Sequence, residues 1–259
     1  MKPVRVPDLR TMKERGEKIS VLTAYDSTMA RLLDRAGVDI ILVGDSVGMV
    51  VLGFDNTLPV TLDMMIHHTS AVSRGAKRAL IVADMPFLTF QLSMEEAMRN
   101  AGRLIQEGGA AAVKIEGGRH IVDTTKRLVD IGIPVMGHLG LTPQSVHQLG
   151  GFRPQGRDSE TAERLLKDAD VLEKAGAFAI VLESIPADLA GRVTASLKIP
   201  TIGIGAGLQC DGQVLVSYDM LGLSENPPPF ARQHAHLAEQ ILSAARAYIE
   251  DVRAGAPQR

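Results

Sequence analysis

The sequence predicts an α/β fold, a single-domain (β/α)8 TIM barrel over residues 1–259 with a short N-terminal segment and a long C-terminal helix. Eight short aliphatic runs recur along the chain, helical patterns separate most of them, and no long linker or shift in composition divides it. Barrels of about 250 residues commonly form one domain. Eight runs favour a closed barrel, and an open doubly wound sheet remains the alternative.

The eight runs are continuous apolar stretches, which is typical of parallel strands that are buried on both faces. We expect strands at residues 20–23, 40–43, 80–83, 112–115, 134–137, 179–182, 201–204 and 213–216. The last two runs are too close together for a full helix between them, which is the weakest point of the assignment.

Capping residues and glycines mark the helices between these strands. We expect helices at residues 28–36, 61–74, 93–107, 119–131, 161–175, 186–197 and 231–252. The loop at residues 139–156 is longer than usual and polar near its end, so it is a candidate lid over a site.

Composition excludes several classes of function. The formal net charge is −2 and there is no tryptophan, so neither nucleic acid nor an anionic membrane is an expected partner. The lone Cys210 fits a reducing compartment and is more simply a small buried residue than a catalytic thiol. Residues 1–15 carry charges throughout and lack the apolar run of a signal peptide. We therefore expect a cytoplasmic protein with small-molecule substrates.

Charged side chains follow the predicted strands at one end. They are Asp45, Asp84, Lys114, Glu116, His138 and Glu183. The carboxyl ends of the strands form the active face of such barrels. A single aspartate at a strand end is equally well explained as the cap of the following helix. The whole set at one end is better explained as an active site.

Strand alternation sharpens this hypothesis. Lys114 and Glu116 share one face of their strand, and charge is tolerated far better inside the barrel mouth than against the outer helices. Asp45, Asp84 and Glu116 come from consecutive strands about 4.8 Å apart, so their carboxylates can converge on one cation. Oxygen ligands favour Mg²⁺ over Zn²⁺. Lys114 would offset part of the remaining negative charge.

Glu183 ends the sixth strand, across the barrel from the second, and is placed to act as a general base. An ion pair with a basic residue is the alternative. His138 ends the fifth strand and is a candidate for binding substrate or orienting a carboxylate, and a structural histidine is equally compatible with its position.

These residues predict a reaction. A metal chelated by the carboxylate and keto oxygens of a 2-oxo acid acidifies the neighbouring C–H. Glu183 would then remove the proton to give a Mg-bound enolate, which Lys114 would help to stabilise. The glycines of residues 203–207 do not form a dinucleotide-binding motif and are better explained by tight packing than by anion binding.

At these residues the chain resembles the ketopantoate hydroxymethyltransferase family. The matching segments occur in family order and are highly specific together. They are residues 23–26, 42–49, 56–61, 83–87, 113–118, 137–145, 181–183, 203–207 and 211–216.

The resemblance implies Mg²⁺-dependent transfer of a hydroxymethyl group from 5,10-methylenetetrahydrofolate to 3-methyl-2-oxobutanoate in pantothenate biosynthesis. It implies metal ligation by Asp45, Asp84 and Glu116, and proton abstraction by Glu183. It also implies contacts to the oxo acid from Asp45, Ser46, Asp84 and Lys114, with His138 added as a candidate from its position. The family is cytoplasmic and typically decameric.

Three other functions compete with this one. A Mg-dependent lyase or mutase of the phosphoenolpyruvate mutase and isocitrate lyase group would need a Lys-Lys-Cys-Gly motif, whereas Cys210 lies between Gln209 and Asp211. A Schiff-base aldolase using Lys114 is disfavoured because neighbouring carboxylates would keep that lysine charged. A binding protein without activity would have lost one of the charged residues.

Overall fold

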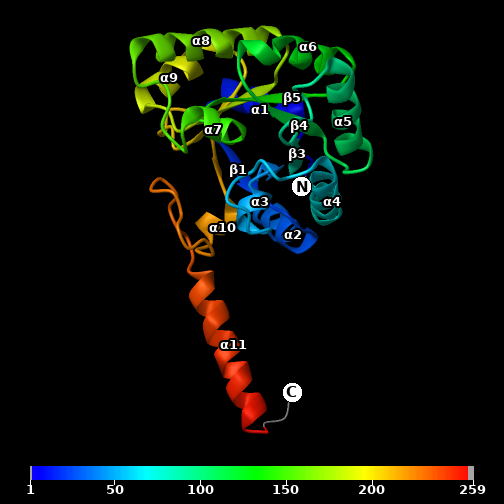
Figure 1. Cartoon of the computed structure of the whole chain (residues 1–259), viewed down its shortest axis with the longest axis vertical. Coiled ribbons are helices and arrows are strands. Elements are labelled where there is room, and N and C mark those ends of the chain that lie inside the picture. The colour runs from blue at the N-terminus through cyan, green and yellow to red at the C-terminus, as the bar shows by residue number, and fades with distance from the viewer. Residues whose placement is uncertain (1, 256–259) are drawn as a thin grey trace. The chain divides into compact units, whose positions relative to one another are not determined.

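Eight parallel β-strands form a closed barrel in which each strand pairs with the next along the chain. The computed structural model describes residues 2–255, and Figure 1 labels the elements along the chain. The strands are β1 (Ile19–Thr23), β2 (Ile40–Val43), β3 (Leu80–Asp84), β4 (Ala112–Glu116), β5 (Val135–Gly140), β6 (Ala179–Glu183), β7 (Thr201–Ile204) and β8 (Gly212–Leu215). All eight predicted strands are confirmed to within three residues.

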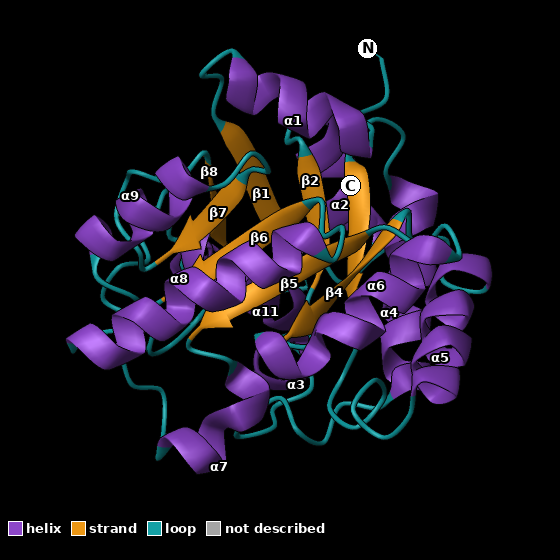
Figure 2. Cartoon of the chain, turned by 90° about the horizontal axis from the view of Figure 1, so that it is seen from above, coloured by secondary structure: helices purple, strands orange, loops and turns teal. Residues whose placement is uncertain are grey.

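The helices mostly alternate with the strands, and helices such as α4, α5 and α8 lie outside the barrel (Figure 2). The α-helices are α1 (Val6–Glu14), α2 (Ser27–Ala36), α3 (Val47–Val50), α4 (Leu62–Gly75), α5 (Met94–Gln106), α6 (Val122–Asp130), α7 (Val146–Leu149), α8 (Ser159–Lys174), α9 (Ala187–Ser196), α10 (Ser217–Met220) and α11 (Leu237–Arg253). Two 3₁₀ turns, Arg119–Ile121 and Pro143–Ser145, precede α6 and α7. Within residues 2–255 no helix separates β7 from β8, as their spacing in the sequence predicted.

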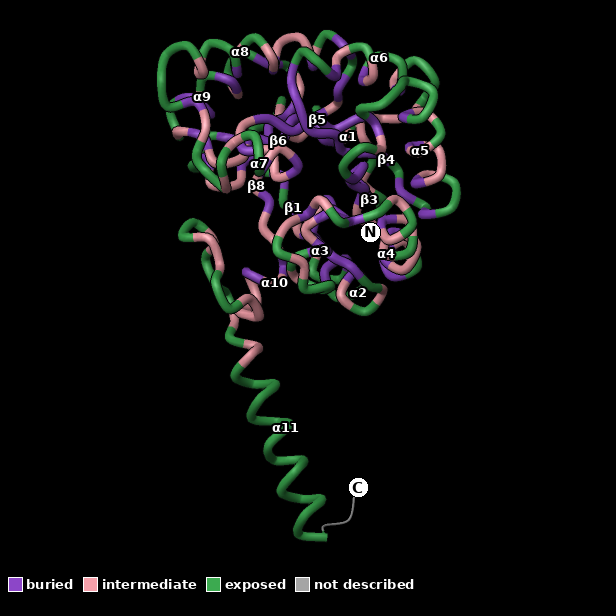
Figure 3. Tube along the Cα trace, viewed as in Figure 1, coloured by how far each residue is buried: buried purple, intermediate pink, exposed green. Residues whose placement is uncertain are grey.

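Contacts divide the chain into two compact units, Met1–Val214 and Leu215–Arg259. The first unit holds the barrel, and the second holds α10 and α11. No residue of α11 is buried, and Figure 3 shows it exposed along its length. The assignment of residues 1–259 to one domain stays a prediction, and its outermost bounds lie outside the described residues.

The prediction for the last helix was wrong at its start. The structure begins α11 at Leu237 rather than at residue 231. The backbone N–H groups of His234 and Leu237 donate to the carbonyls of Met220 and Leu221. Because those donors are used by the α10 segment, the intervening residues do not continue the helix.

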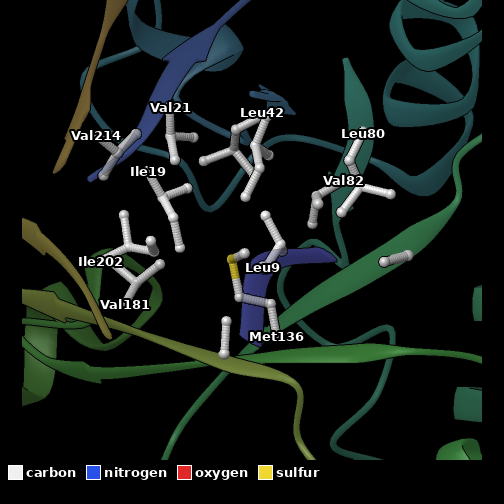
Figure 4. Packing of buried hydrophobic residues seen from close by; sticks show 13 residues of the cluster. Leu9, Ile19, Val21, Leu42, Leu80, Val82, Met136, Val181, Ile202 and Val214 are labelled. Atoms are coloured by element: carbon white, nitrogen blue, oxygen red, sulfur yellow. The ribbon is translucent and has the colours of Figure 1, made fainter. Parts of the chain in front are cut away.

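The lower barrel interior is filled by aliphatic side chains. Alternate strand residues such as Ile40, Leu42, Val82 and Val181 meet there (Figure 4). Leu9 of α1 packs among them and is fully buried, so this N-terminal helix closes the barrel floor. The layer above is polar, because the same interior positions of β3–β6 then carry acids, a lysine and a histidine.

Candidate active site

The strand register brings the predicted charged residues together at the carboxyl end of the barrel. Asp84 lies beside Lys114, and Glu116 lies beside His138, in neighbouring strands. All four residues are at least 94% buried. They occupy the interior face that Val82, Ala112 and Met136 occupy one layer below. The face predicted from strand alternation is therefore confirmed.

Lys114 lies between the acids and the histidine. Its Nζ is 3.1 Å from Asp84 Oδ1 and 3.1 Å from His138 Nδ1. Burial alone would lower the pKa of Lys114, but the charges of Asp84, Glu116 and Asp45 outweigh it and raise that pKa. The ammonium form of Lys114 is therefore favoured, which disfavours the free amine that a Schiff-base mechanism needs.

Asp45 follows β2 and lies at the same level. Its backbone N–H donates to Asp84 Oδ2 at 3.0 Å. Burial, followed by the nearby charges of Asp84 and Glu116, holds the pKa of Asp45 well above its usual range. Burial likewise raises the pKa of Asp84, although the Lys114 ammonium opposes that shift. Two adjacent buried acids with raised pKa values indicate negative charge that lacks full compensation.

The aspartates do not cap helices, which was the alternative for each of them. The cap residue of α3 is Ser46, and the side chain that caps α5 is Ser93, which accepts from the Glu96 N–H. Ser46 Oγ instead lies 2.9 Å from the hydroxyl of Tyr25, a buried residue just past β1. Tyr25 was not predicted for the site; its place directly after a strand was the available signal.

His138 connects the acid cluster to Glu183. Its Nε2 lies 3.1 Å from Glu183 Oε2, and its Nδ1 lies 3.5 Å from Glu116 Oε1. Burial and the Lys114 charge oppose protonation of the ring, but Glu116 and Glu183 outweigh both and raise the pKa of His138 to about 9. The alternative for Glu183 was an ion pair with a basic residue, and in the structure His138 is the partner of such a pair. The Glu183 side chain remains 16% exposed, which leaves it accessible at the mouth.

The loop after β5 reaches into the site through Gln144. Its side-chain amide donates to Asp45 Oδ2 and to the carbonyl of Met85, both at 2.9 Å. Its backbone N–H donates to Glu116 Oε2 at 3.0 Å. The predicted lid at residues 139–156 therefore begins with a segment anchored in the site. Its role as a lid stays a prediction.

The donor chemistry fits a hard divalent cation. Asp45, Asp84 and Glu116 bring carboxylate oxygens to one buried region, and neither Asp84 Oδ1 nor Glu116 Oε1 accepts a hydrogen bond of good geometry. Across residues 2–255 no three acidic, histidine or cysteine side chains are already arranged around a single ion position. These side chains would therefore have to rearrange to complete a ligand set.

Comparison with known proteins decides between the functions that this geometry allows. Residues 3–258 match the ketopantoate hydroxymethyltransferase family. The chain belongs to this family. Among its relatives, the 3-methyl-2-oxobutanoate hydroxymethyltransferase of Syntrophus aciditrophicus is 59% identical over 248 residues, 95% of this chain and 91% of the relative. That of Prosthecochloris aestuarii is 60% identical over 252 residues, with the same two coverages. The resemblance found in the sequence is confirmed.

Solved structures of other enzymes share the barrel of this hydroxymethyltransferase family member. Phosphonopyruvate hydrolase, in complex with oxalate and Mg²⁺, aligns with a TM-score of 0.65 at 13% identity and covers 98% of this chain and 88% of its own. The 2,3-dimethylmalate lyase of the phosphoenolpyruvate mutase and isocitrate lyase superfamily aligns at 0.62 with 19% identity, covering 98% and 89%. At such identities the likeness shows the fold alone. The chain is thus an enzyme of the hydroxymethyltransferase family on a barrel shared with lyases and mutases.

Proposed function

We propose that this enzyme transfers a one-carbon unit from 5,10-methylenetetrahydrofolate to 3-methyl-2-oxobutanoate. With one water consumed, the products are 2-dehydropantoate and tetrahydrofolate, a step of pantothenate biosynthesis. The observation that carries the proposal is the family match over residues 3–258 together with the buried charged cluster at the barrel mouth. Relatives named for this activity support it at 59–60% identity.

Asp45, Asp84 and Glu116 would hold a Mg²⁺ ion in this proposal. Asp84 Oδ1 and Glu116 Oε1 accept no hydrogen bond of good geometry, and burial beside other acids raises the pKa values of Asp45 and Asp84; both observations support a cation at this position. When bound, such an ion acts as a Lewis acid on the keto oxygen of the oxo acid and acidifies its C3–H bond. Asp45, Ser46, Asp84 and Lys114 would contact the oxo acid itself.

Glu183 would accept the C3 proton at its carboxylate. Its Oε2 lies 3.1 Å from His138 Nε2, and the carboxylate stays accessible. The electron pair left on C3 would then form a C–C bond to the one-carbon unit. Water would supply the oxygen of the new hydroxyl group, and both C–N bonds to the folate would break. The C3 proton and one proton of the water would end on the two folate nitrogens as tetrahydrofolate leaves. The Lys114 ammonium, paired with Asp84 at 3.1 Å, would stabilise negative charge that develops on the substrate.

The lyase or mutase reading is less well supported. Its enzymes share the fold at 13–19% identity, whereas relatives at 59–60% identity carry the hydroxymethyltransferase name. A barrel that binds a small molecule without catalysing a reaction is also disfavoured. Such a protein would have lost a charged residue, whereas each predicted charged residue lies in the cluster.

We further propose a cytoplasmic protein that forms a homo-oligomer, a decamer by family resemblance. No helix among residues 2–255 has the length and apolar character needed to cross a membrane. Sedimentation velocity at several protein concentrations measures the assembly size, and a monomer throughout would refute the oligomer.

Proton NMR of 3-methyl-2-oxobutanoate in heavy water tests the reaction. With the enzyme and Mg²⁺ we expect the methine signal to disappear as deuterium replaces the C3 proton. Omitting Mg²⁺ should stop the exchange. If no exchange occurs with the folded enzyme, with Mg²⁺, and after addition of tetrahydrofolate, this oxo acid is not the substrate.

A further inference from the structure

Gln144 is a neutral side chain buried among the acids of the site. It is 6% exposed and lies in the 3₁₀ turn Pro143–Ser145 after β5. We propose that Gln144 is a positioning residue that sets the placement of Asp45 and Glu116 for cation binding. The inference rests on the proposed function, since it takes these two carboxylates to be metal ligands.

Gln144 holds the two acids through different groups. Its side-chain Nε2 donates to Asp45 Oδ2 at 2.9 Å, while its backbone N–H donates to Glu116 Oε2 at 3.0 Å. These acids belong to segments 99 and 28 residues earlier in the chain. One residue therefore fixes the relative position of two carboxylates that no direct hydrogen bond joins. Each acid keeps its second oxygen for another partner.

The partners determine how the Gln144 amide is oriented. Nε2 faces the Asp45 carboxylate and the Met85 carbonyl, which both accept hydrogen bonds. Both N–H groups of the amide therefore donate a hydrogen bond. If the amide nitrogen and oxygen were interchanged, the oxygen would face two acceptors and neither bond could form. The amide oxygen accepts from Gln91 Nε2 at 3.2 Å. Gln144 is thus fully hydrogen-bonded, which restricts its rotation.

Gln91 comes from the loop between β3 and α5 and is exposed to solvent. Its side-chain Nε2 joins this loop to Gln144, 53 residues later in the chain. The loop after β5 is held at a further point, since the Leu141 N–H donates to the Glu183 carbonyl at 2.9 Å. The loop that carries Gln144 is therefore fixed to the strand that carries the proposed base.

Gln144→Met tests the part of the proposal that concerns Asp45, because the methionine side chain has a similar length and shape but cannot donate, while the backbone N–H to Glu116 is kept. The matched control is Gln148→Met, an exposed glutamine in α7 of the same loop. Mn²⁺ serves as the probe, and electron paramagnetic resonance counts the free ion during titration with 3-methyl-2-oxobutanoate present. Thermal unfolding without metal is measured on the same samples.

We expect Gln144→Met to weaken Mn²⁺ binding about 10–100-fold, as is typical when a hydrogen bond to a metal ligand is removed. Gln148→Met should bind like the unaltered enzyme. Gln91→Met, a surface change, should weaken binding a few-fold and add nothing on top of Gln144→Met, since it acts through the same amide. The unfolding temperature without metal should fall far less than the affinity.

Affinity of Gln144→Met within twofold of the unaltered enzyme would overturn the proposal. If that variant fails to fold, Gln91→Met decides, and unchanged affinity in it would overturn the proposal equally. Failure of the unaltered enzyme itself to bind Mn²⁺ would instead overturn the proposed metal site, and this inference with it.

Discussion

Replacing Lys114 by methionine removes the ammonium that lies among the buried acids. In the metal-free protein, Asp84 loses a partner at 3.1 Å, and Asp45 and Glu116 lose the cation that opposes their charge. Removing one partner of a buried ion pair costs about 3–5 kcal/mol of unfolding free energy. For a domain of this size, that corresponds to a fall in unfolding temperature of roughly 6–20 °C.

The assay is thermal unfolding at pH 8 with and without Mg²⁺. At this pH fewer of the buried acids are protonated than at lower pH, so loss of the Lys114 charge leaves more negative charge without a partner. Because Mg²⁺ would compensate the same carboxylates, we expect it to raise the unfolding temperature of Lys114→Met more than that of the unaltered enzyme.

Lys13→Met is the matched control. Lys13 also pairs with an acid, Asp211 at 2.9 Å, and donates to the carbonyls of Thr194 and Ile199 at the other end of the barrel. Its loss should destabilise the protein without recovery by Mg²⁺. The reasoning is refuted if Lys114→Met unfolds at the same temperature as the unaltered enzyme, or if Mg²⁺ restores both variants equally.

Three further predictions concern Glu183 and Asp84 in the site and Asp34 in α2. Glu183→Gln should keep oxo-acid binding by calorimetry but slow deuterium exchange about 10²–10⁴-fold, the usual contribution of a general base; normal exchange would remove Glu183 from that role. Asp84→Ala should weaken Mn²⁺ and oxo-acid binding together, and unchanged metal affinity would contradict its assignment as a ligand. Asp34→Asn should lose about 1.5–3 kcal/mol at pH 7, since Asp34 accepts from the backbone N–H groups of residues 77–79 at 2.7–3.0 Å and hydrogen bonds to a charged group contribute that much. Burial opposes ionisation of Asp34, but these bonds outweigh it and lower its pKa, so the stabilisation is present above about pH 4. Urea unfolding should show the difference from Asp34→Asn shrinking as pH falls below about 4 towards the lowered folded pKa, and a gap that stays constant as pH falls below about 4 would contradict this origin.

The strands and the charged cluster were predictable because their signals are local. A parallel strand buried on both faces is a continuous aliphatic run. Charged side chains at the end of such a run are costly to bury against the outer helices, so they are expected at the barrel mouth. Alternation then places Lys114 and Glu116 on one face, as the structure shows. The positions of these residues do not test which role each one has in the reaction, so the roles stay a proposal.

Gln144 and α1 could not be predicted in the same way. The partners of Gln144 lie far away in the chain. The family resemblance covers residues 137–145, but an uncharged amide after a proline in a loop has no chemical pattern that predicts its role. The charged segment at residues 6–14 carries only Pro7 and Asp8 as helix-start signals, and its role depends on Leu9 entering a barrel that exists only after folding. Both are consequences of tertiary structure.

The barrel closes between its first and last strands, so it cannot be completed until the last strand has left the ribosome. β1 is completed by its bond to the far end of the chain, where the Ile19 N–H donates to the Asp211 carbonyl at 3.0 Å. Lys13 reaches the same aspartate through its side chain. Contacts so distant in sequence form slowly. A nascent chain that has not yet emerged beyond β8 therefore leaves β1 with an open edge, so the earliest-made strand is exposed to misassociation for the longest time.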